Sequence, residues 1–218
     1  MATSTLDYVH HIKNAIAHWQ QIEAKTNKTL VLKDKTTLSA MTELRDRLIA
    51  VQSANLTEAN NLQRAQETRD GALKTLHPLF KQARTSLKGL VEDVPGAKAL
   101  PALLPANSEP QKYLQAANDI AEVWAKVNTS EAQPITIPLL VEQETVQVTQ
   151  AAFVAAVAAF SSAVDTLMTA RSAEALGRKT RDSLHKIAKA KLIAYPTAAK
   201  ARLADGDPLR ATIPTFSS

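Results

Sequence analysis

Two pairs of aromatic residues with the same spacing constrain the fold more than any other feature of this sequence. Tyr8 is followed by Trp19, and Tyr113 by Trp124, eleven residues later in each case. The second pair lies 105 residues after the first, in a chain that has nine aromatic residues among 218. A fixed spacing of rare residues that recurs at a long offset indicates an internal duplication.

Further matches between the two halves follow in the same order. They occur at offsets of 112 or 113 and join Thr37 with Thr149, Thr68-Arg69-Asp70 with Thr180-Arg181-Asp182, and Pro95 and Pro101 with Pro208 and Pro214. The change of offset from 105 to 112 requires seven extra residues in the second copy, which fit in 129–146. These matches predict two repeats, at 1–105 and 106–218, packed as one elongated domain.

Each repeat is expected to form a helix, a short β element and a long helix. Apolar residues three and four positions apart between Leu6 and Trp19 predict the first helix, and a similar pattern follows Pro110. Short β-rich runs at 29–32 and 135–148 predict a small hairpin in each repeat. Long helical patterns then continue to Pro78 and Pro196, and a proline can kink a helix without ending it.

The composition agrees with a helical fold, since the chain has 38 Ala and 4% aromatic residues. We expect an all-α protein with two small β-hairpins, built as an elongated helical bundle of the coiled-coil kind. Antiparallel long helices would relate the repeats by a pseudo-twofold axis. The apolar periodicity predicts a buried core that includes Ile12, Ile16, Trp19, Leu44, Leu48, Ile120, Trp124, Phe153 and Phe160.

Several site classes lack their sequence signals. The chain has no cysteine, which excludes disulfides, thiolate catalysis and cysteine-ligated metals. Neither a glycine-rich phosphate loop nor a Gly-x-Ser-x-Gly motif occurs, and the five histidines do not form a His-Glu-x-x-His zinc pattern. We therefore expect no catalytic residue, cofactor or metal ion, and we expect the histidines to be polar surface residues.

The N-terminus lacks the basic start and apolar stretch of a signal peptide. The most apolar stretch runs from Ala151 to Val164, which is too short to cross a bilayer. We expect no transmembrane segment and a cytoplasmic protein, with export that needs no cleavable signal as the alternative.

Basic residues gather near the C-terminus. Residues 171–218 contain ten basic and four acidic residues, whereas 1–170 contain sixteen and seventeen. This excess predicts a candidate polyanion-binding surface, made by Arg178, Lys179, Arg181, Lys186, Lys189 and Lys191. The alternative is an ordinary solvated helix face.

The repeated Thr-Arg-Asp motif predicts contacts between the repeats. If the long helices cross antiparallel, Arg69 would pair with Asp182 and Arg181 with Asp70. Gly177, like its equivalent Ala65, is small enough to permit close helix approach there. The alternative is local pairing within each helix between residues three or four positions apart.

These features favour a non-enzymatic structural or interaction protein, with self-association or protein partners in a larger assembly. One alternative is a protein that binds nucleic acid or an anionic surface through the basic helix at 178–191. The other is a ligand-binding or catalytic helical bundle, which would need a sizeable pocket with convergent polar groups.

Overall fold

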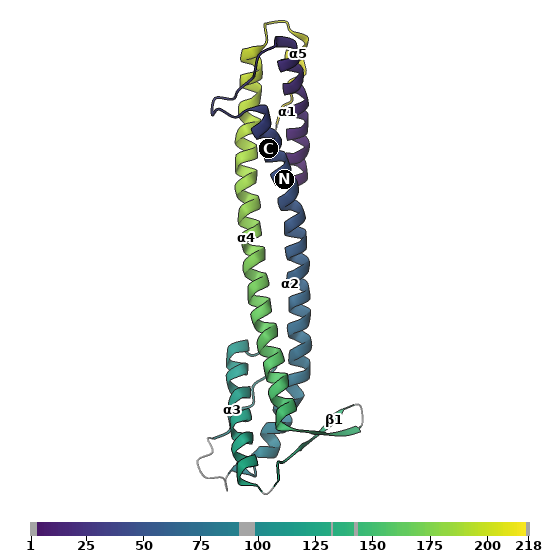
Figure 1. Ribbon diagram of the computed structural model, residues 1–218, viewed down its shortest axis with the longest axis vertical. Helices are drawn as coiled ribbons and strands as arrows, with labels where there is room; N and C mark the ends of the chain where they lie inside the picture. Colours follow the sequence, from purple (N-terminus) through teal and green to yellow (C-terminus); the bar gives the residue numbers. More distant parts are fainter. Residues whose placement is uncertain (1–3, 92–98, 132, 142–143, 217–218) are drawn as a thin grey trace. The chain divides into compact units, whose positions relative to one another are not determined.

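The computed structural model describes residues 4–91, 99–131, 133–141 and 144–216. The elements in chain order are α1 (Thr5–Thr26), α2 (Leu38–Leu87), α3 (Pro110–Ser130), β1 (Ile137–Val141), β2 (Glu144–Val148), α4 (Gln150–Arg202) and α5 (Pro208–Ala211) (Figure 1). The fold is mainly helical, as the composition predicts, with 76% of the residues in helices.

The chain divides into two compact units. Unit 1 comprises residues 1–60 and 172–218, and unit 2 comprises residues 61–171. Helices α2 and α4 are therefore divided, and each contributes one part to unit 1 and the other part to unit 2. This division differs from the repeats predicted at 1–105 and 106–218, because each unit takes its third helix from the other half of the chain; the repeat boundaries themselves stay a prediction.

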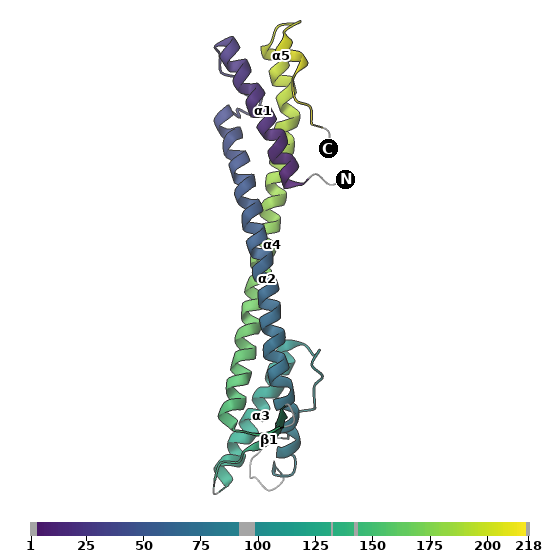
Figure 2. The same ribbon diagram turned by 90° about the vertical axis from the view of Figure 1, so that its right-hand side faces the viewer.

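The core of unit 1 forms where α1 packs against the first part of α2 and the last part of α4 (Figures 1 and 2). The ring of Trp19 stacks on that of Tyr195 with centroids 5.4 Å apart. Leu44 and Leu48 of α2 complete the same cluster with Leu192 of α4. Burial of these apolar side chains supplies the main driving force for folding of the unit.

The core of unit 2, like that of unit 1, consists of aliphatic and aromatic side chains. Helix α3 packs against the end of α2 and the start of α4, and Trp124, Phe153 and Phe160 are fully buried there. All nine core residues predicted from the apolar periodicity are buried, which confirms that prediction. The stretches around Pro78 and Pro196 stay helical because buried residues such as Phe80 and Tyr195 hold the helix in its cluster.

Side-chain hydrogen bonds cap the starts of α1, α2 and α4. Ser4 caps α1 with a capping box that includes Asp7. The hydroxyl of Thr37 accepts from the N–H of Ala40 at 3.3 Å, and that of Thr149 accepts from the N–H of Ala152 at 3.2 Å. Each threonine thus caps the start of a long helix, because its hydroxyl accepts from the N–H of the residue three positions later.

The prediction of two hairpins is wrong for the first repeat. In the described residues the sheet is a single antiparallel pair, β1 with β2, in which Ile137 faces Val148 and Leu139 faces Val146. Residues 28–37 form a loop instead, because the N–H of Leu32 already bonds the carbonyl of Thr36 at 3.0 Å. This tight turn leads straight into α2, so no second strand follows to pair with 29–32 in the part of the chain that the structure describes.

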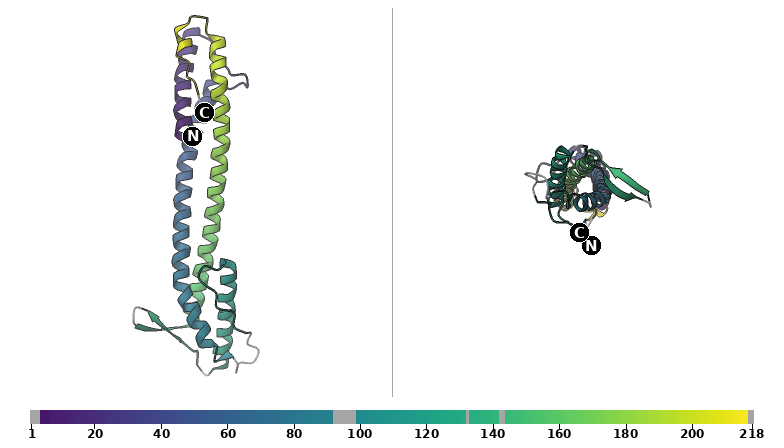
Figure 3. Two further views of the ribbon diagram at one scale, coloured as in Figure 1. Left: turned by 180° about the vertical axis from the view of Figure 1, so that it is seen from behind. Right: turned by 90° about the horizontal axis from the view of Figure 1, so that it is seen from below.

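The hairpin of unit 2 is anchored at its base. Ile137 and Val148 are buried in the core, whereas the strands extend away from the helices of their unit (Figure 3). A two-stranded ribbon is marginally stable in water without such an anchor. The outer edges of β1 and β2 thus lie away from the helices of unit 2.

Candidate functional site

The six predicted polyanion-binding residues have different surroundings. Arg178 pairs with Glu174, and Arg181 pairs with the adjacent Asp182 at 2.9 Å. Lys191 contacts the carboxylate of Asp34. Ion pairs of this kind lower the charge that these three basic residues offer to a ligand.

The other three candidates, Lys179, Lys186 and Lys189, have exposed side chains on α4. They occupy positions separated by seven and three residues, so they follow one side of the helix. The basic surface predicted from the sequence is thus concentrated in these three lysines.

The four residues of the predicted contacts between repeats lie in different units. Arg69 and Asp70 belong to unit 2, whereas Arg181 and Asp182 belong to unit 1. Each arginine pairs with the aspartate that follows it, at 2.9 Å in both cases. These pairs join adjacent residues rather than residues three or four positions apart, and the reciprocal pairing stays a prediction.

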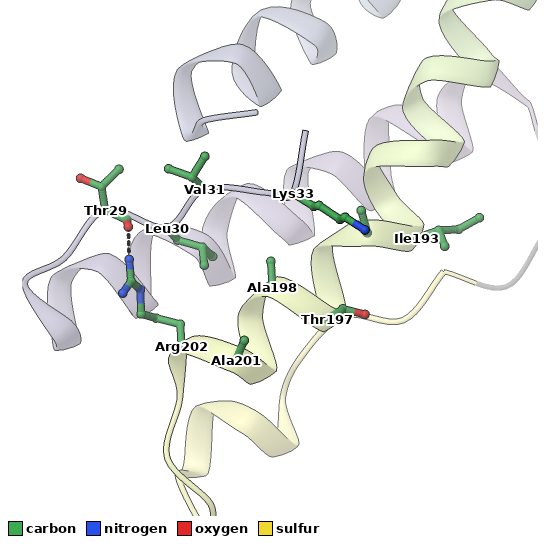
Figure 4. Close-up of a pocket in the computed structure, with 10 residues that line it drawn as sticks. Thr29, Leu30, Val31, Lys33, Ile193, Thr197, Ala198, Ala201 and Arg202 are labelled. Carbon is green, nitrogen blue, oxygen red and sulfur yellow. Dashed lines mark hydrogen bonds between the residues drawn. The ribbon is translucent and has the colours of Figure 1, made fainter. Parts of the chain in front are cut away.

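A groove in unit 1 separates the 28–37 loop from the last turns of α4 (Figure 4). Its volume is about 570 Å³, within the range of ligand pockets. Leu30 and Lys33 point from the loop toward α4, as Figure 4 shows, and Arg202 bonds the carbonyl of Thr29 at one end. The helix side is lined mainly by alanines and Ile193. The groove is therefore apolar along its length, with basic residues at its margins.

Buried leucines and one glutamate fix the loop side of the groove. Leu30 and Leu32 insert into the core of unit 1. One carboxylate oxygen of Glu23 accepts both from the N–H of Leu30 at 2.8 Å and from the indole N–H of Trp19 at 3.0 Å. The side chains of segment 29–32 alternate between exposed and buried, as in an extended chain. The segment is held in place by α1, although it has no partner strand in the described residues.

The turn of the loop is bound to α4 by charge. Lys191 contacts Asp34 and the hydroxyl of Thr36, and Lys35 adopts a left-handed conformation with φ of 66°. The hydrogen bond from Lys191, with that from Thr36, lowers the pKa of Asp34 to about 2. Lys191 thus positions the groove wall. The sequence predicts Lys191 as part of a polyanion-binding surface and does not predict this role.

His18 lies inside unit 1, so the prediction that the histidines are surface residues is wrong for this one. Its ring contacts the hydroxyl of Tyr195 and the carbonyl of Leu209, each at 2.7 Å. The sequence does contain a signal, because His18 lies three residues after Ala15 and four before Ile22, on the apolar side of α1.

A small polar pocket lies between α2 and α4 in unit 1. It measures about 210 Å³ and is lined in part by Asn55, Glu174 and Arg178. A Cβ atom at Gly177 would overlap the side-chain oxygens of Asn55 and Glu58. Side chains of α2 thus pack on Gly177, and the close backbone approach predicted there stays a prediction.

No group of three or more possible metal ligands occurs in the part of the chain that the structure describes. Among the same residues, α4 is the one helix long and apolar enough to cross a membrane by length and composition, with a window of mean hydropathy 1.7. A third of that window (33%) is buried, and the absence of a transmembrane segment stays a prediction.

No protein-family model matches this chain, and no similarity to a curated protein or to a solved structure was found.

Proposed function

We propose that this chain is a non-enzymatic interaction protein that serves as a subunit of an assembly. The observation that carries the proposal is the groove of unit 1, with its apolar lining and the exposed side chains of Val31 and Ile193. Exposed apolar surface beside a groove is typical of a site for another polypeptide. Lys33 and Arg202 at its margins favour a partner segment that is apolar and carries acidic residues.

An extended partner segment suits the groove better than a helix does. The loop wall at 29–32 is extended and without a partner strand among the described residues. An extended segment gains main-chain hydrogen bonds when it adds to such a wall, and its alternate side chains fill the groove. This mode of binding needs no catalytic group.

Binding of anilinonaphthalene sulfonate, an anionic aromatic dye, tests whether the groove accepts an apolar, negatively charged group. We expect fluorescence enhancement with the wild type and its loss with Ala201→Glu, which places a charge on the groove lining. Ala190→Glu is the matched control, since Ala190 is exposed on α4 outside the groove. Equal enhancement in both variants, or none in the wild type, would overturn the proposal.

We further propose an internal duplication as the origin of the two halves of the chain, 1–105 and 106–218. Glu23 accepts from the N–H of Leu30, and Asn128 accepts from the N–H of Ile135 at 2.9 Å. The two acceptors are 105 positions apart in the sequence, and so are the two donors. The helix caps at Thr37 and Thr149 are 112 apart, as are their donors. Matched bonds at 105, the offset of the matched aromatic residues, and at 112, the offset of the matched Thr-Arg-Asp motifs, support a common origin.

A second candidate function is binding of a polyanion through Lys179, Lys186 and Lys189, which is supported by their exposure along one side of α4. Fluorescence anisotropy with a labelled DNA duplex tests it at low and high salt, since contacts to phosphates weaken steeply with salt. Substitution of the three lysines by Gln should abolish binding. The same substitution at the exposed Lys13, Lys74 and Lys88 is the charge-matched control, and equal binding by both variants would contradict the proposal.

A further inference from the structure

Each unit contains a segment with a backbone edge that has no partner strand among the described residues. In unit 1 the segment 29–32 is extended and buries Leu30 and Leu32, yet it has no partner strand in the described residues. In unit 2 the described sheet consists of β1 and β2, so each strand has one edge without a partner. In segment 29–32 the N–H groups of Leu30 and Leu32 already bond Glu23 and Thr36, so the edge that can take a strand is the one on which Val31 lies. Strand edges without a partner offer backbone donors and acceptors to another chain.

The apolar face of the hairpin continues beyond the core of its own unit. Alternate residues of a strand share a face, so Val146 lies on the same face as Val148. Val148 is buried, whereas Val146 is 47% exposed. Leu139, which faces Val146 across the ribbon, is partly buried. One end of this apolar face is thus anchored in unit 2, and the other is open to solvent.

The charges of the hairpin and of the groove are complementary. Residues 137–148 contain two acidic residues, Glu142 and Glu144, and no basic residue. The groove has Lys33 and Arg202 at its margins. The units differ in the same sense, with 16 basic and 10 acidic residues in unit 1 and 10 basic and 11 acidic residues in unit 2. Such complementarity favours pairing of unlike units over pairing of like ones.

The sequence of the ribbon identifies the strand that pairs. Pro138 removes one backbone donor from β1, and proline is a common device against further pairing at a strand edge. The residues of β2, from Glu144 to Val148, include no proline and keep every donor. Strand β2 is therefore the better edge for addition of another strand.

We propose that β2 of one copy adds to the extended segment 29–32 of a second copy and places Val146 in the groove beside Ile193. This inference rests on the proposed function, because it names the partner that the groove binds. The contact joins two different surfaces of the same protein, so each copy retains one free hairpin and one free groove. A contact of that kind builds open chains of copies rather than a closed dimer, unless the rotation closes a ring.

Sedimentation velocity on the full chain tests the proposal. The mass of the wild type should rise above 23.6 kDa with concentration at low salt and fall back at high salt. Val146→Lys and Ile193→Glu should each stay at the monomer mass. Val154→Lys and Ile187→Glu should assemble like the wild type, since Val154 and Ile187 are 43% and 40% exposed on α4 outside the proposed contact. Circular dichroism and thermal unfolding verify that all four variants are folded.

Mixing the two defective variants gives the sharpest outcome. Val146→Lys keeps its groove and Ile193→Glu keeps its hairpin, so an equimolar mixture should form a dimer of twice the monomer mass and grow no further. Assembly by Ile193→Glu alone would overturn the proposal in favour of pairing between hairpins. A wild type that stays monomeric at low salt would also overturn it. If the dye still binds the groove in a manner that Ala201→Glu abolishes, the proposed function survives and the second copy is excluded as its partner.

Discussion

The imidazole Nδ1 atom of His18 lies 2.7 Å from the hydroxyl oxygen of Tyr195 in the interior of unit 1. The other ring nitrogen, Nε2, lies 2.7 Å from the carbonyl oxygen of Leu209, which can only accept. In the neutral ring Nε2 therefore carries the hydrogen, and Nδ1 accepts from Tyr195. One side chain of α1 thus joins α4 to the residues of α5. Burial raises the pKa of Tyr195, which keeps its hydroxyl protonated as the donor.

We predict that Tyr195→Phe lowers the free energy of unfolding by about 1–3 kcal/mol, because it leaves the buried Nδ1 of His18 without a donor. Tyr113→Phe is the control, since the hydroxyl of Tyr113 bonds His77 at 2.9 Å, and His77 is partly exposed, so water can replace the donor. Urea unfolding compares the two variants. An equal loss in both would show that burial of His18 does not matter.

The ion pair between Asp34 and Lys191 predicts a pH dependence. The pKa of Asp34 is lowered to about 2 in the folded protein by its bonds to Lys191 and Thr36. A carboxylate with a depressed folded pKa contributes stability that is fully present above its ordinary pKa of about 3.9 and is lost as the pH falls through the folded value. The stability difference between the wild type and Asp34→Asn should therefore shrink between about pH 4 and pH 2.

Lys191→Gln provides the control for this prediction. In that background Asp34 loses its main partner but keeps its bonds from Thr36, so the effect of Asp34→Asn on stability should vary less with pH in that range than it does in the wild type. The measurement is thermal unfolding of the four proteins as a function of pH. A pH-dependent difference of unchanged size without Lys191 would mean that Lys191 does not lower the pKa of Asp34.

The helices and the core follow from local patterns, which explains why the sequence predicts them. The spacing of Ile12, Ile16 and Trp19 defines one face of α1 without any knowledge of its neighbours. The caps at Thr37 and Thr149 also depend on residues three positions away. Helix faces and helix caps can therefore be predicted from a single sequence, because they depend on residues only a few positions apart.

The features of the groove depend on residues far apart in the chain, and the sequence does not pair them. Lys191 meets Asp34 across 157 residues, and His18 meets Leu209 across 191. The run 29–32 has the composition of a strand, but a strand forms only where a partner is available, and the turn at Lys35 directs the chain into α2. Tertiary contacts therefore decide its structure.

The buried clusters predict where truncation is costly. Leu48→Ala in unit 1 and Phe160→Ala in unit 2 should each lower the free energy of unfolding by about 2–5 kcal/mol, because each leaves a cavity in a packed core. Leu56→Ala, at an exposed position of α2, should change it by less than about 0.5 kcal/mol. Urea unfolding followed by circular dichroism measures all three. A core variant as stable as Leu56→Ala would place its side chain in solvent.

The two helical glycines, Gly71 and Gly177, should respond differently to alanine. Nothing lies within 4 Å of a Cβ built at Gly71, so Gly71→Ala should stabilise the protein by about 0.5–1 kcal/mol through the higher helix propensity of alanine. Gly177→Ala should gain less, because the new methyl group displaces the side-chain oxygens of Glu58 and Asn55. Adding Glu58→Ala and Asn55→Ala should restore the full gain at residue 177. Thermal unfolding checks the series. If Gly177→Ala gains as much as Gly71→Ala while Glu58 and Asn55 are present, these two side chains do not pack on the glycine.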